Sequence, residues 1–180
     1  EIKYKFHACC HGLHSFLEAL EELKQENNFN PESIEEIAIE TNPSWLKVCN
    51  IQEPKTGLES KFSYKLTAAM SIYGKDTADL ATYNDDICFD DKMNNIRNKV
   101  KVIPNDQLSN TQSLISIKDG SKDIKNKHDL SDKIDHNILE TKIVNKSASL
   151  LSKNKSHEIS KMLNAPYESK ISSLVDCLVS

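Results

Sequence analysis

The segment Phe6–His14 most constrains the fold of this chain, because it places three histidines and two cysteines in nine residues and leads directly into a helical pattern. We predict a helix over residues 15–25, begun by a capping box in which Ser15 and Glu18 each bind the other's backbone N–H. The apolar residues of this helix share one face: Phe16, Leu17, Leu20 and Leu23. We expect its charged residues to point to water: Glu18, Glu21, Glu22 and Lys24.

Length, charge and cysteine content exclude several classes of protein. The 180 residues fit one domain, or one domain with a short appendage. The net charge is −4 and no basic block stands out, so we expect no nucleic-acid partner. No apolar run approaches the roughly 20 residues that cross a bilayer, and no signal segment opens the chain. Five cysteines without framework spacing are typical of free thiols, and together these features predict a cytoplasmic protein without a membrane partner.

The imidazoles and thiols of Phe6–His14 are compatible with three kinds of chemistry. Zinc sites draw ligand pairs from separated segments, and the other histidines are scattered, so we expect no metal. A cysteine nucleophile with a histidine base fits the residue types, but no neighbour marks Cys9 or Cys10 as activated, and we interpret both as packing residues. His14, beside a helix start that favours anions, can instead exchange a proton or bind a carboxylate. Alternatively, His14 is only a polar residue at the helix start, without a chemical role.

A second unusual segment, Thr56–Tyr64, also opens a helical pattern, and we expect it to meet Phe6–His14 in space. Apolar side chains recur at helical spacing through this pattern: Phe62, Leu66, Ala69, Met70 and Tyr73. Gly74 is expected to end the helix. Lys61 would lie in its first turn, where the helix dipole disfavours a cation. An anionic substrate or Glu59 would compensate that charge, unless Lys61 is simply exposed.

The remaining patterns predict an α+β region followed by helices. We expect strands at Lys3–Phe6, Ile34–Thr41, Val100–Ile103 and Ser113–Ile117, the last two paired, and a helix over residues 90–99. Residues 121–135 are polar and predict a surface loop or linker. Helices follow from residue 138, one of them capped by Ser156. We divide the chain into an α+β domain at residues 1–130 and a helical segment at residues 131–180.

The two segments together resemble hallmarks of the C-terminal domain of the MmgE/PrpD family, which includes 2-methylcitrate dehydratase, cis-aconitate decarboxylase and iminodisuccinate epimerase. The first hallmark is similar to residues 5–14, KFHACCHGLH, followed by FLEAL at residues 16–20. The second is similar to residues 54–63, PKTGLESKFS. Two separated motifs in the right order are more specific than either motif alone.

This resemblance implies a fold and a function. The α+β part would be a lid-type domain, with a small sheet and packed helices, and the last helices would belong to a mainly helical domain. The family abstracts a proton next to a carboxylate without a cofactor or metal, and thereby dehydrates, decarboxylates or epimerises small di- or tricarboxylates. His14 matches the motif histidine and would be catalytic, whereas Lys61 matches the motif lysine and would bind substrate. Some members carry a catalytic tyrosine where Leu66 stands here, and Tyr64 is out of register by two positions.

The same resemblance leaves a second hypothesis open. Family members carry a large helical domain before this region, and the chain opens at Glu1 without Met, so we expect it to be part of a longer protein. If that domain is absent from the natural protein, the chain would be a truncated, non-catalytic or structural domain of the same fold. The resemblance also implies a small polycarboxylate as substrate and a homodimer as the assembly.

Overall fold

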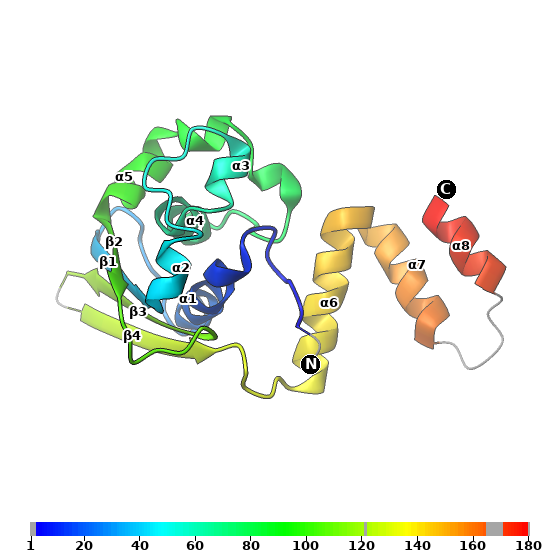
Figure 1. Cartoon of the computed structure of the whole chain (residues 1–180). Coiled ribbons are helices and arrows are strands. Elements are labelled where there is room, and N and C mark those ends of the chain that lie inside the picture. Colours follow the sequence, from blue (N-terminus) through cyan, green and yellow to red (C-terminus); the bar gives the residue numbers. More distant parts are fainter. Residues whose placement is uncertain (1–2, 121, 165–170, 180) are drawn as a thin grey trace.

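The structure is a computed structural model that describes residues 3–120, 122–164 and 171–179. Helices and a four-stranded mixed sheet make up an α+β fold, as the sequence predicts (Figure 1). The helices are α1 (His14–Glu26), α2 (Pro43–Leu46), α3 (Gly57–Ser60), α4 (Tyr64–Ile72), α5 (Asp91–Lys99), α6 (His136–Leu151), α7 (Lys153–Asn164) and α8 (Ile171–Val179). The 3-10 helices are η1 (His11–Leu13), η2 (Leu80–Thr82) and η3 (Asp86–Cys88).

The strands lie in the order β2-β1-β3-β4, with β1 at Ile34–Thr41, β2 at Val100–Pro104, β3 at Gln112–Asp119 and β4 at Lys122–Asp129. β1 pairs parallel with β2 and antiparallel with β3. The parallel pair requires a long crossover, which the chain makes through α2 to α5. Gly120 has φ +58 in the turn after β3, a conformation that glycine adopts at low cost.

One face of the sheet is buried, because alternate side chains of β1 and β3 point into the core. The buried residues of these strands include Ile37, Ile39, Ile115 and Ile117. Helix α1 packs against β3 and β4, and α4 packs against α1, α5 and β2. The apolar face predicted for α1 is fully buried, and Asn27 ends the helix. Gly74 ends α4 with φ +68, as predicted.

The C-terminal helices leave this core. Figure 1 shows α6 beside the N-terminal segment, whereas α7 and α8 extend away from the sheet. Three polar contacts hold α6 in place: Lys142 Nζ with Glu18 Oε2, Lys146 Nζ with the Ala78 carbonyl at 2.6 Å, and Ser149 Oγ with the same carbonyl at 3.1 Å. The α+β region therefore contacts the helical segment through polar groups of α1 and of the loop around Ala78.

Three predictions about the strands and loops are wrong. The stretch Lys3–Phe6 forms no strand. The strands β2 and β3 do not pair, because β1 lies between them. The polar stretch predicted as a loop contains β4, which pairs along its whole length with β3. A strand at the edge of a sheet needs few apolar residues, since one face and one edge stay in water.

The predicted capping box at the start of α1 is also wrong. The helix begins at His14, directly after η1, and its first turn has no side-chain cap. The Ser15 hydroxyl lies 2.5 Å from that of Ser113 on β3. Glu18, expected in water, is 5% exposed. Ser156 is likewise not a cap but lies inside α7, with its hydroxyl against Ser147.

Where residues are described, no helix is long and apolar enough to cross a membrane.

Candidate active site

The two motif segments meet, as the sequence predicts. The Cys10 N–H donates a 2.9 Å hydrogen bond to the Lys61 carbonyl. On the other side of Phe6–His14, the Ala8 N–H donates at 2.8 Å to the Thr77 carbonyl. Backbone hydrogen bonds thus fix this segment between two loops before it turns into η1 and α1.

His14 lies at the start of α1 and is 1% exposed. Its ring centroid is 5.1 Å from those of both His7 and His11. Burial, followed by the charges of His7, His11 and Lys5, lowers the pKa of His14 to about 3, although a backbone hydrogen bond with Cys9 acts in the opposite direction. The Nε2 atom is buried and has no hydrogen-bond partner among the residues that the structure describes. His14 is therefore a neutral imidazole at neutral pH, with one buried ring nitrogen that is not engaged in a hydrogen bond.

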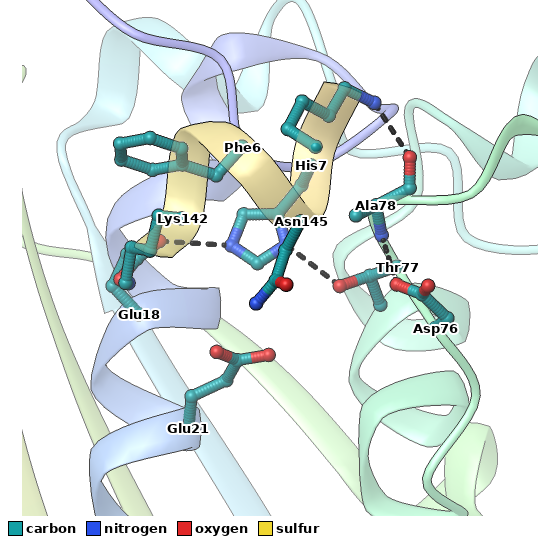
Figure 2. A pocket seen from close by; sticks show the side chains of 10 residues that line it. Phe6, His7, Glu18, Glu21, Asp76, Thr77, Ala78, Lys142 and Asn145 are labelled. Carbon is teal, nitrogen blue, oxygen red and sulfur yellow. Dashed lines mark hydrogen bonds and ion pairs between the residues drawn. The ribbon is translucent and has the colours of Figure 1, made fainter. Parts of the chain in front are cut away.

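His7 lies in a network of polar side chains, which Figure 2 shows. Its Nδ1 is 2.7 Å from Thr77 Oγ1, and its Nε2 is 3.2 Å from Glu18 Oε1. The other Glu18 oxygen contacts Lys142 Nζ. Burial alone would raise the pKa of Glu18, but hydrogen bonds with His7 and Lys142 lower it to about 2. These residues line a cavity of about 140 Å³ between α1, α6 and the Asp76–Ala78 loop.

Lys61 is not in the first turn of the long helix, contrary to the prediction. It follows the last turn of α3, and Ser63 caps α4 with its hydroxyl. Glu59 does not compensate its charge, because the Glu59 carboxylate accepts from the Lys55 N–H at 2.7 Å. Lys61 Nζ instead lies 5.9 Å from the centroid of the Tyr83 ring.

Lys61 lines an open hollow of about 390 Å³ together with two further lysines, Lys5 and Lys146. His7 and Cys10 also line it, and the apolar side chains of Leu58, Phe62 and Leu80 complete its wall. No acidic side chain is among its described lining residues. His14 does not line this hollow, whereas its ring neighbour His7 does. Three ammonium groups around one hollow favour an anionic ligand.

The residues around Leu66 have structural roles. Leu66 is fully buried in α4. The Tyr64 hydroxyl donates at 2.7 Å to the Gly12 carbonyl and lies 3.2 Å from Thr41 Oγ1. Burial raises the pKa of Tyr64 well above its usual value. Tyr64 therefore connects the Gly12 carbonyl of η1 to Thr41 on β1.

The cysteines fit the packing interpretation in part. Cys9 is 2% exposed, and burial raises the pKa of its thiol to about 12. Cys10 is half-buried and lines the hollow. Within residues 3–120, 122–164 and 171–179, no group of three or more His, Cys, Asp or Glu side chains is arranged to hold a metal ion.

Sequence reasoning missed Lys5, Lys146 and the partners of His7. Lys5 and His7 belong to the first motif, so the sequence could have indicated that they lie near His14. Glu18 and Lys146 gave no such signal, because a charged residue on a helix is usually exposed.

Comparison with known protein families identifies the family of this chain. The model of the MmgE/PrpD C-terminal domain matches residues 7–164. The chain therefore belongs to the MmgE/PrpD family, as a C-terminal domain. No match was found among curated proteins.

Proposed function

We propose that this chain is the C-terminal portion of a cofactor-independent lyase or isomerase that acts on a small di- or tricarboxylate. Residues 1–130 would form the lid-type domain, and residues 131–180 would belong to a mainly helical domain. The observation that carries the proposal is the Cys10–Lys61 hydrogen bond, which brings the histidine motif and the lysine motif together beside a hollow lined by three lysines.

In this proposal His14 is the acid/base or carboxylate-binding group. A general base needs a free lone pair and works best with a pKa near the working pH. The unpartnered Nε2 of His14 supports this role, whereas its pKa of about 3, which burial lowers, makes the imidazole a weak base. Abstraction of a proton next to a carboxylate places negative charge on the carboxylate oxygens. The ammonium of Lys61 would stabilise that charge.

A second function has its own supporting observation. His14 is 1% exposed and does not line the hollow. A non-catalytic or structural domain of the same fold would keep such a histidine as a buried packing residue. The location in the cytoplasm and a homodimeric assembly remain expectations from the sequence.

Turnover distinguishes the two functions. We expect the natural polypeptide that contains these residues to consume cis-aconitate or 2-methylcitrate, and His14→Ala to abolish turnover while circular dichroism stays unchanged. Lys47→Ala, at an exposed lysine outside the hollow, is the control. Equal turnover of His14→Ala and wild type would reject the catalytic role, and absence of turnover in the wild type would favour the structural domain.

A further inference from the structure

The proposed role of His14 leaves a second buried histidine unexplained. His7 is 4% exposed, and both of its ring nitrogens are engaged (Figure 2). An imidazole has two ring nitrogens that can form hydrogen bonds, and side chains engage both of them here. The two partners come from distant parts of the chain, Glu18 on α1 and Thr77 in the loop before η2.

These partners fix how His7 is oriented. The Glu18 carboxylate is ionised above its pKa of about 2 and can only accept, so Nε2 of His7 carries a proton. The Nδ1 atom lies 2.7 Å from the Thr77 hydroxyl, which can donate to it or accept from it. Lys142 contacts the second oxygen of Glu18 and fixes the carboxylate in turn. The ring of His7 therefore has a defined orientation.

The ring of His7 contacts the ring of His14. The two rings meet edge to face, with centroids 5.1 Å apart and an interplanar angle of 77°. His11 contacts the His14 ring as well, at the same centroid distance. The groups that face His7 from its surroundings are Glu18 and Glu21 on α1, Asp76 in the loop, and Lys142 and Lys146 on α6.

We propose that His7 is a positioning residue for His14, held in one orientation by Glu18, Thr77 and Lys142. This inference rests on the proposed role of His14. Because Lys142 belongs to α6, the contact of α6 with α1 also orients the imidazole pair. A comparable pair joins Glu22 on α1 to His128 on β4, 2.8 Å apart at the surface.

The test is the imidazole nitrogen spectrum of the protein, recorded by long-range ¹H–¹⁵N NMR without substrate. We expect Nε2 of His7 to carry a proton in the wild type. In Glu18→Gln the side-chain amide can donate or accept, so we expect the His7 nitrogen signals to change and the His14 ring signals to split or broaden. Thr77→Val should have the same effect, and Thr77→Ser, which restores the hydroxyl, should recover the wild-type spectrum. Glu22→Gln is the matched control.

Unchanged His7 and His14 signals in Glu18→Gln and Thr77→Val would overturn the proposal, as would equal changes in Glu22→Gln. If Glu18→Gln does not fold, the comparison of Thr77→Val with Thr77→Ser decides. This experiment contains no substrate, so it tests only the orientation of the two rings. The proposed function is tested separately, by the turnover of the His14→Ala variant.

Discussion

The Cys10 N–H and the Lys61 carbonyl are joined by a 2.9 Å hydrogen bond, and this bond links the two segments that define the family resemblance. It places the lysine of the second motif next to the cysteine pair of the first. His14 is buried beside His7, whereas Lys61 lines the hollow. The proposed function therefore requires both segments, and it depends on how they pack together.

Gly12 is expected to be essential for the packing of Phe6–His14 against Trp45 and Cys49. A Cβ atom at this position would lie 2.5 Å from Trp45 Cε3 and 2.8 Å from Cys49 Sγ. We predict that Gly12→Ala lowers the free energy of unfolding by about 1–3 kcal/mol, the usual cost of overpacking. Urea unfolding measures the change. The smaller Leu side chain at position 45 would make room for the added methyl group. Gly12→Ala should therefore destabilise the Trp45→Leu variant less than it destabilises the wild type.

His14 should make stability depend on pH. Its folded pKa of about 3 lies below the usual 6.5, so between these values the unfolded chain binds a proton that the folded chain excludes. The free energy of unfolding therefore falls as the pH is lowered through this window, by at most about 1.4 kcal/mol per pH unit for this group.

Glu18 acts in the same direction at lower pH, because its folded pKa of about 2 lies below the usual 4.5. The pH dependence of the unfolding free energy, compared between wild type and His14→Asn, gives the contribution of His14. We expect the unfolding free energy of the variant to be less steep between pH 6 and pH 4.5. Identical slopes for the two proteins would show that His14 titrates normally.

The contact between Glu18 and Lys142 should contribute more to stability than a surface ion pair. The Glu18 side chain is 6% exposed, so loss of Lys142 leaves a buried carboxylate with one partner fewer. We predict that Lys142→Met lowers the free energy of unfolding by about 1–3 kcal/mol. Lys101→Met, which breaks an exposed pair with Glu36, should cost less than about 1 kcal/mol. Equal effects in denaturant unfolding would contradict the role given to Lys142.

The fold was predictable where apolar spacing is regular. The strand β1 has the predicted bounds, and α5 begins one residue after its predicted start, because Asp90 caps it. The strand β4 was not predictable, since its pairing with β3 requires little apolar surface of its own. Instead, Asn126 of β4 donates to the Ala19 carbonyl at 3.2 Å and to Glu22 at 2.6 Å, contacts that no local pattern shows.

The candidate site was predictable in its two motifs but not in its supporting residues. The meeting of Phe6–His14 with Lys61 is confirmed, whereas the position of Lys61 in a helix start is wrong. Glu18 has the spacing of an exposed helical residue and is buried because His7 and Lys142 both reach it. Contacts of this kind arise from tertiary packing and leave no mark on helical periodicity.

Titration with propane-1,2,3-tricarboxylate, followed by the amide ¹H–¹⁵N spectrum, tests the carboxylate site most directly. We predict saturable shifts at Cys10 and Lys61, with affinity reduced about tenfold or more in Lys61→Met, since a charged hydrogen bond contributes about 1.5–3 kcal/mol. Lys47→Met, at an exposed lysine outside the hollow, should bind as the wild type does. Absence of shifts at Cys10 and Lys61, or equal binding by Lys61→Met and wild type, would contradict the assignment of this hollow as a polycarboxylate site.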